Sequence, residues 1–256
     1  TQKSGKIKAG SYELKPNTTP RGLIDQMVRG EFAQESLTII EGWTFRQMRE
    51  AVANNKGLRH DTAKMSDAEL MAKISPEYKA PEGLFFPDTY LFAKGASDLT
   101  IYKQAHTTLL AKLNAAWEKR AEGLPYTTPY QALVMASIVE KETGKESERP
   151  MIAAVFVNRL KRGMMLQTDP TVIYGIGHKF DGNIRKKDLE TDTPYNTYMR
   201  AGLPPTPIAL PGEKSLAAAL GPATTEALYF VSRGDGSSQF SDNLPDHNRA
   251  VNKFQR

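Results

Sequence analysis

Cysteine is absent from this sequence of 256 residues, and its absence excludes three kinds of chemistry. A disulfide framework, a thiolate zinc site and a cysteine nucleophile each need a thiol group. Long apolar runs are absent too. The longest, Ala132 to Val139, contains Ser137 and is far shorter than the about 20 residues that a membrane-spanning helix needs. At Thr1 no charged segment precedes an apolar one, as it would in a secretory signal.

Blocks of like charge are also missing. Lysine and arginine number 34 against 29 aspartates and glutamates, which leaves a formal net charge of +5 and a pI near 9.2. This excess mildly favours acidic polymers or anionic membrane surfaces as partners. Because no run of about five or six basic residues occurs and the cluster Arg185 to Lys187 is short, we interpret the charge as a solvated surface and expect no nucleic acid.

Several motifs that carry chemistry in other proteins do not occur. The four histidines, His60, His106, His178 and His247, lack the spacing of metal ligands, so no metal site is expected. The sequence has neither a Gly-x-Ser-x-Gly nucleophile elbow nor a phosphate-binding loop. We therefore expect no cofactor, and carboxylates remain as the candidates for catalysis.

The patterning predicts an α+β fold in two parts, with a boundary near residue 45. Residues 1–45 are expected to form a small strand, helix, strand unit. Its first strand is predicted around Gly10 to Leu14, and its second from Ser36 to Ile40. Between them, Thr19 is a good N-cap, Pro20 suits the first helical position, and Gly30 ends the helix.

Residues 46–256 are expected to form a larger, mainly helical domain with a few short strands. Residues 44–113 look mostly helical, interrupted by an aromatic turn at residues 82–90. Its side chains Phe85, Phe86 and Tyr90 suit either a platform on which sugars stack or the protein core. Further along, the patterns predict a helix from Thr128 to Gly144, a helix over 147–162 and a polar loop over 167–171. A loop-rich stretch over 181–211, a helix over 215–220, a strand over 227–232 and a final helix after Asp246 complete the chain.

Glu140 is the candidate for catalysis. At 100° per residue it lies about 20° from Leu133, so it continues an apolar face of the predicted helix. Burial on such a face disfavours the charged carboxyl and suits a group that gives up a proton and takes it back. Proton donation to the leaving oxygen is what cleavage of a glycosidic bond requires. The spacing also allows a helix-end residue that is exposed or paired with Lys141 or Lys145.

A second carboxylate is harder to find. Most glycosidases use two, yet Glu142 lies about 200° from Glu140 around the helix and cannot share its face. Asp169 and Asp88, both in predicted loops, remain as partners for a two-carboxylate hydrolase. A lytic mechanism needs only one carboxylate, because the C6 hydroxyl of the sugar replaces water and closes a 1,6-anhydro ring.

Long motifs occur in order along the chain: Lys8–Tyr12, Phe86–Thr89, Ala136–Thr143, Val157–Leu160, Leu166–Gly175, Tyr195–Tyr198 and Gly202–Pro205. They resemble those of the endolytic murein transglycosylases, the YceG-like family, over almost the whole chain. By this resemblance Glu140 holds the position of the catalytic glutamate. The residues that the resemblance places in motifs lining the cleft are Gln167, Thr168, Asp169, Tyr174 and Asn196, and Asp88 falls in an upstream motif that we also assign to substrate binding.

The resemblance implies more than residue roles. Residues 1–45 would be a LysM-like subdomain, and residues 46–256 the transglycosylase domain. Members of the family cut nascent peptidoglycan glycan strands, act with peptidoglycan synthases (penicillin-binding proteins), and face the periplasm from the inner membrane on one N-terminal helix. We therefore expect this chain to be the periplasmic part without its anchor. A peptidoglycan-binding scaffold without catalysis is the alternative from another class.

Overall fold

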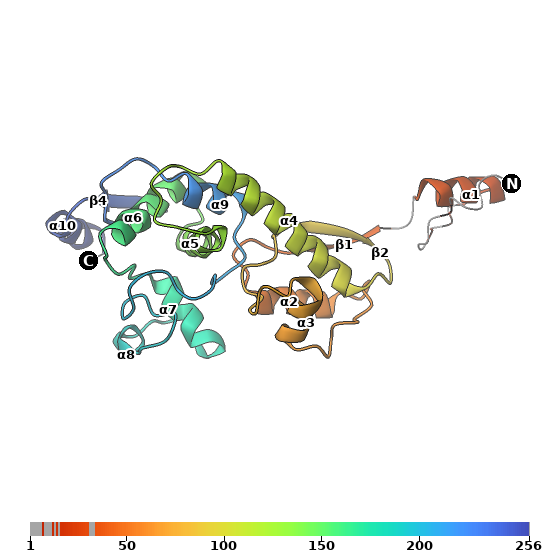
Figure 1. Cartoon of the computed structure of the whole chain (residues 1–256), viewed down its shortest axis with the longest axis horizontal. Helices are drawn as coiled ribbons and strands as arrows, with labels where there is room; N and C mark the ends of the chain where they lie inside the picture. The colour runs from red at the N-terminus through yellow and green to blue at the C-terminus, as the bar shows by residue number, and fades with distance from the viewer. Residues whose placement is uncertain (1–6, 8–11, 13, 15, 31–33, 256) are drawn as a thin grey trace.

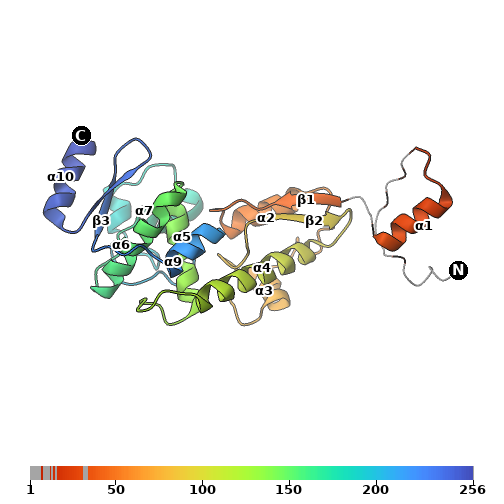
Figure 2. The ribbon, with the colours of Figure 1, turned by 90° about the horizontal axis from the view of Figure 1, so that it is seen from above.

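The computed structural model describes residues 7, 12, 14, 16–30 and 34–255. It is an α+β structure in which helices dominate and two small antiparallel sheets, β1–β2 and β3–β4, lie apart from each other (Figures 1 and 2). In chain order the elements are α1 (Pro20–Arg29), β1 (Gln34–Thr38), α2 (Phe45–Asn54), α3 (Asp67–Ile74), β2 (Thr89–Ala93), α4 (Asp98–Glu118), α5 (Pro129–Glu142), η2 (Glu146–Glu148), α6 (Arg149–Lys161), α7 (Asp169–Ile176), η3 (Gly177–Lys179), α8 (Lys186–Glu190), α9 (Glu213–Leu220), β3 (Tyr229–Ser232), β4 (Ser238–Ser241) and α10 (Leu244–Phe254). In the described part, no helix has the length and apolar character that crossing a membrane requires.

Helix α1 confirms the predicted capping signals. The Thr19 side chain accepts a hydrogen bond from the Gly22 amide, and Gly30 ends the helix in the left-handed conformation. Figure 1 shows α1 at one end of the molecule, away from the other helices, and none of its residues is buried. The strand predicted around Gly10 to Leu14 falls largely outside the described residues.

Strand β1 pairs with a segment that we did not expect to be a strand. Its partner is β2, with Gln34 opposite Ala93 and Thr38 opposite Thr89. The prediction of a turn at residues 82–90 within helical surroundings is therefore wrong beyond Asp88. In β2, exposed and buried residues alternate as expected for a strand covered on one face. The second strand of the predicted N-terminal unit thus joins the segment that follows it, and the division at residue 45 stays a prediction.

The aromatic turn belongs to the core. Phe85, Phe86 and Tyr90 are 0%, 5% and 4% exposed. Phe85 stacks on Phe45 with ring centroids 5.2 Å apart and meets Tyr102 edge-on at 5.8 Å. The stacking platform for sugars is therefore wrong for these three side chains. Large aromatic side chains stabilise a protein more when they are buried in its core than when they are exposed on a loop.

Helix α5 is buried along most of its length. Every side chain from Ala132 to Val139 is buried, and α5 packs against α4, α6, α7 and α9. The predicted N-cap is confirmed, since Thr128 accepts a hydrogen bond from the Gln131 amide. The helix ends at Glu142 rather than at Gly144, with Thr143 in extended conformation as its C-cap.

The C-terminal half follows the predictions for α6, α9, β3 and α10 within a few residues. The polar loop expected over 167–171 is wrong beyond Thr168, because α7 begins at Asp169. Pro170 lies in the first turn of that helix, where a missing amide hydrogen is harmless. A proline inside a polar stretch thus marks a helix start here rather than a loop.

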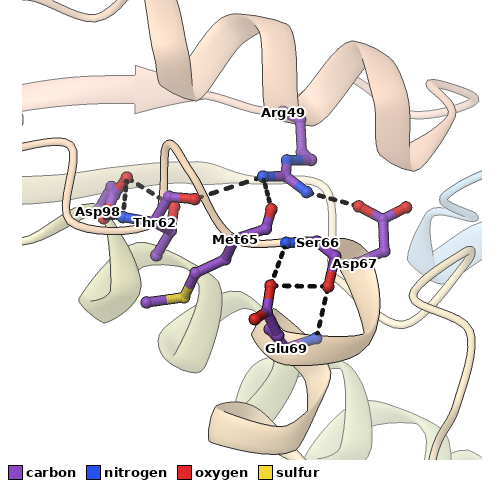
Figure 3. Close-up of polar contacts among 7 residues, drawn as sticks. All are labelled: Arg49, Thr62, Met65, Ser66, Asp67, Glu69 and Asp98. Atoms are coloured by element: carbon purple, nitrogen blue, oxygen red, sulfur yellow. Dashed lines mark hydrogen bonds and ion pairs between the residues drawn. The ribbon is translucent and has the colours of Figure 1, made fainter.

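A polar network joins α2, α3 and the segment between them (Figure 3). Arg49 donates to the carbonyl oxygens of Thr62 and Met65, at 3.4 and 2.7 Å, and to Asp67 at 2.5 Å. Asp98, which is 1% exposed, accepts bonds from the Thr62 amide and hydroxyl. The network satisfies backbone groups of a segment that has no regular structure.

We expect Arg49→Met to lower the free energy of unfolding by about 1–3 kcal/mol, because the Met65 carbonyl and the Asp67 carboxylate lose the guanidinium donor, while the Thr62 carbonyl keeps only the Met65 amide. Arg46→Met is the matched control: its ion pair with Glu50 spans 3.5 Å between side chains that are 65% and 59% exposed. Loss of that pair is expected to change stability by no more than about 0.5 kcal/mol. Urea unfolding of both variants measures the difference, and equal effects would contradict the structural role of Arg49.

Candidate active site

Glu140 lies in the last turn of α5 with its side chain 5% exposed. Its carboxylate accepts three hydrogen bonds: from Arg149 Nη2 at 3.1 Å, from the Gly212 amide at 2.9 Å and from Ser215 Oγ at 2.7 Å. The expected burial is therefore confirmed. The expected apolar surroundings are wrong for the carboxyl group itself, which extends beyond the apolar face to these donors.

The donors come from the starts of two helices. Arg149 is the first residue of α6, and its side chain is 9% exposed. Gly212 is the N-cap of α9, and Ser215 lies in the first turn of that helix. Free amide groups and the helix dipole make a helix N-terminus a favourable place for an anion. The carboxylate of Glu140 is thus held by fixed donors rather than by flexible surface side chains.

A second carboxylate, Glu41, shares Arg149 with Glu140. Glu41 Oε2 lies 4.0 Å from Arg149 Nη2, and its side chain is 48% exposed. Two backbone bonds place this segment: the Gly42 amide donates to Leu210 O at 2.9 Å, and the Leu210 amide to Trp43 O at 2.7 Å. The pKa of Glu41 is raised, first by burial and then by the charge of Glu140.

Gly212 leaves room for the Glu41 carboxyl. A Cβ atom on Gly212 would lie 2.0 Å from Glu41 Oε1, so a side chain there would displace the carboxyl group. Sequence reasoning did not identify Glu41, Arg149 or Ser215. The sequence contained one local hint of Glu41, which is that this acidic residue directly precedes a glycine. In the structure that glycine, Gly42, has a φ of +76°, in the left-handed region that favours glycine.

The side chain of Glu142 leaves α5 on a different face from that of Glu140, as the helical spacing predicts. Its carboxyl accepts a hydrogen bond from Thr168 Oγ1, just before α7. Burial raises the pKa of Glu142 to about 7, and the charge of Asp169 adds to the shift. Asp169 accepts a bond of 2.6 Å from the Tyr198 hydroxyl and is not among the hydrogen-bond partners of Glu140.

A cavity of about 660 Å³ lies beside the C-terminal end of α5. It reaches α5 at Lys141, the residue next to Glu140, whose ammonium group donates to Gly42 O at 3.2 Å. Residues at the start of α2 and residues of α7 line the cavity, and Figure 1 shows both helices below α5. Its lining residues are Thr44, Arg46, Gln47, Glu82, Lys141, Pro170, Ile173, Tyr174, Gly177, His178, Phe180, Tyr195 and Ile208.

Of the six substrate-binding residues that we predicted, Tyr174 lines this cavity and the other five do not. Gln167 is exposed, with a positive φ of 50°, and Thr168 is 2% exposed. Asn196 is 1% exposed, and its amide donates to three backbone carbonyls between residues 188 and 191. Asp88 is exposed just before β2 and accepts a bond from the next amide in the chain.

Histidine and acidic side chains do not gather into a metal-binding group of three or more within the described ranges. The polar groups around Glu140 are instead a guanidinium, a hydroxyl and a backbone amide. Such donors orient a carboxylate and stabilise negative charge. The arrangement therefore holds the Glu140 carboxylate in a fixed orientation.

Comparison with known proteins identifies the family. The YceG-like family model matches residues 1–253, and the chain belongs to this family. An endolytic murein transglycosylase of Bacillus subtilis is 33% identical over 97% of this chain and 73% of its own length. One of Streptococcus pneumoniae is 29% identical over 96% of this chain, which spans 50% of that relative. The crystal structure of a YceG-like protein from Listeria monocytogenes has a TM-score of 0.70 and 32% identity, covering 95% of this chain and 84% of that one.

We expect Glu142→Gln to stabilise the protein at pH 8 and not at pH 5. The folded-state pKa of about 7 lies above the ordinary 4.5, so this contribution to stability is complete below about pH 4.5 and is lost as the pH rises through about 7. Glutamine stays neutral and keeps an oxygen for Thr168. The expected gain at pH 8 is on the order of 1–2 kcal/mol. Thermal unfolding at both pH values measures it, and a difference independent of pH would contradict the assignment.

Proposed function

We propose that this chain is an endolytic murein transglycosylase, which cleaves the MurNAc–GlcNAc bond within glycan strands and leaves 1,6-anhydro-MurNAc ends. The observation that carries the proposal is the buried carboxylate of Glu140, held by three donors beside a large cavity. The names of the relatives from Bacillus subtilis and Streptococcus pneumoniae support the same reaction.

In this mechanism Glu140 acts twice. As an acid it gives its proton to the glycosidic oxygen while the bond from that oxygen to C1 of MurNAc breaks. As a base it takes the proton of the C6 hydroxyl, whose oxygen then bonds to C1 and closes the ring. No water is consumed, and Glu140 ends protonated as it began. Arg149, Gly212 and Ser215 would hold the carboxylate in place between the two steps.

The proposal also includes the setting in which the reaction takes place. We infer that the substrate is the nascent strand, that cleavage ends its elongation beside peptidoglycan synthases, and that the intact protein acts at the periplasmic face of the inner membrane. The LysM-like assignment of residues 1–45 belongs to the same proposal. These statements rest on the family resemblance, and substrate-binding roles for Gln167, Thr168, Asp169, Asn196 and Asp88 rest on it too.

One observation favours a second candidate, a hydrolase with two carboxylates. Arg149 Nη2 lies 3.1 Å from Glu140 Oε1 and 4.0 Å from Glu41 Oε2. These two carboxylate oxygens are therefore no further apart than the sum of the two distances. This upper limit includes the spacing of the two carboxylates in a retaining glycosidase, about 5–5.5 Å, and only the lower end of the about 6.5–9.5 Å found in an inverting one. In such an enzyme Glu41 would take the part that we assigned to Asp169 from the sequence.

Replacing Glu140 by Gln is expected to lower cleavage by at least about a hundredfold, because the amide has no proton to transfer. Purified sacculi are digested, and the muropeptides are analysed by mass spectrometry for anhydro ends. Glu226→Gln, the same change in a side chain that is 81% exposed, is the matched control and should retain activity. Retained cleavage in the Glu140 variant would refute the mechanism. Strand binding without any product from the unaltered chain would favour a scaffold.

Glu41→Gln separates the lyase from the hydrolase. We expect its products to keep 1,6-anhydro ends, with a rate lower by less than about tenfold, because the Glu41 side chain is 48% exposed and lies 4.0 Å from Arg149. Hydrated reducing ends from the unaltered chain that disappear in this variant would instead establish the hydrolase. Anhydro ends differ from hydrated ones by one water, so the same mass spectra decide the question.

A further inference from the structure

The donors around Glu140 act against its proposed role as an acid. Its carboxyl accepts hydrogen bonds from Arg149 at 3.1 Å, from the Gly212 amide at 2.9 Å and from Ser215 at 2.7 Å. Positive charge and donated hydrogen bonds favour the ionised form of a carboxyl group. The lytic mechanism begins with a protonated glutamate, so the proton must stay in place until the glycosidic oxygen takes it. A negative charge beside Arg149 would offset the guanidinium and favour that proton.

Glu41 places a negative charge at the same guanidinium. Arg149 Nη2 lies 4.0 Å from Glu41 Oε2 and 3.1 Å from Glu140 Oε1. The backbone next to Glu41 also lies beside the Glu140 side chain, since a Cβ atom on Gly42 would be 3.8 Å from Glu140 Cγ. The side chains of Arg149 and Glu140 are 9% and 5% exposed, so solvent screens the charges on their side only weakly.

The backbone keeps the Glu41 carboxyl in this place. The Gly42 amide donates to Leu210 O at 2.9 Å, and the Leu210 amide donates to Trp43 O at 2.7 Å. At the start of α9, Gly212 leaves room for the carboxyl group, because a Cβ atom there would lie 2.0 Å from Glu41 Oε1. The position of this carboxyl therefore follows from two backbone bonds and from the missing side chain of Gly212.

Other charged groups lie on the elements that meet Glu140. The carboxylates of η2 and α9 are each paired with a lysine: Glu146 with Lys214 at 2.8 Å, Glu148 with Lys145 at 3.4 Å and Glu213 with Lys112 at 2.7 Å. On α5, Lys141 donates to Gly42 O at 3.2 Å, and Glu142 leaves the helix on another face, toward Thr168. Glu41 differs from these carboxylates because the cation beside it, Arg149, also binds Glu140.

We propose that Glu41 is a positioning residue for the cleavage reaction: its negative charge offsets Arg149 and keeps the proton on Glu140 until the glycosidic oxygen takes it. Glu41 is 48% exposed and Glu140 only 5%, so water stabilises a charge on Glu41 better. The interaction is mutual, because burial and then the charge of Glu140 raise the pKa of Glu41. This inference rests on the proposed lytic mechanism and adds the group that keeps its acid protonated.

Glu41→Gln tests the inference because it removes the charge and keeps the size of the side chain. The whole chain is labelled with ¹³C at its glutamate carboxyl groups, and the Glu140 signal is assigned by its absence from Glu140→Gln. We expect the midpoint of its NMR titration to fall by about half to one pH unit in Glu41→Gln. Glu41→Asp keeps the charge and should retain most of the parent value. The shift should shrink at about 1 M salt, because Glu41 is 48% exposed.

Glu146→Gln is the matched control. It removes another carboxylate charge from the same region, but this side chain is 65% exposed and paired with Lys214. The titration midpoint of Glu140 should therefore move by less than about 0.2 pH unit. An unchanged midpoint in Glu41→Gln, or equal shifts in the two variants, would overturn the inference.

Digestion of sacculi over a range of pH connects this titration to the reaction. The rate at which 1,6-anhydro ends appear falls at high pH as the acid loses its proton, and in Glu41→Gln we expect this fall about half to one pH unit lower. A shifted midpoint without any anhydro product from the unaltered chain would uphold the charge interaction and refute the proposed reaction. Anhydro products with an unshifted midpoint would do the reverse.

Discussion

The packing of α5 on every side is the constraint on which the candidate site depends. Because each side chain from Ala132 to Val139 is buried, the helix cannot rotate without repacking the domain. The two carboxyls at its end are therefore aimed in set directions. Glu140 meets the N-terminus of α9, and Glu142 meets Thr168 before α7. The position of the central carboxylate follows from the core rather than from a loop.

The polar groups near the end of α5 come from several distant parts of the chain. Around Glu140, a guanidinium, a hydroxyl and a helix N-terminus supply donors, which orient the carboxylate. In the cavity beside it, the Tyr174 hydroxyl donates to the buried carboxylate of Glu82. Both carboxylates are thus held by side chains that only the tertiary structure brings to them.

Local signals predicted the helices better than the strands. Thr19 with Pro20 and Thr128 with Pro129 marked helix starts, because a cap and a fixed φ act on the next turn alone. Strand β2 was missed, since its partner β1 lies far away in sequence and pairing is not a local property. The same limit explains the aromatic turn: the sequence allowed core or surface, and only the packing of Phe85 against Phe45 decided between them.

By itself the sequence determined the family and showed that Glu140 continues an apolar face of its helix, because long motifs in fixed order and a helical period of 3.6 residues are both written along the chain. The sequence left open whether the carboxyl group is buried. Only the tertiary structure decided which groups surround that carboxylate. Arg149 lies 9 residues from it and Ser215 lies 75 away. It also showed that Glu41, rather than Asp169, shares Arg149 with Glu140, and that the Asn196 side-chain amide donates to three backbone carbonyls. Contacts between segments that are distant in sequence depend on how the whole core packs, and the local periodicity of the sequence does not contain that information.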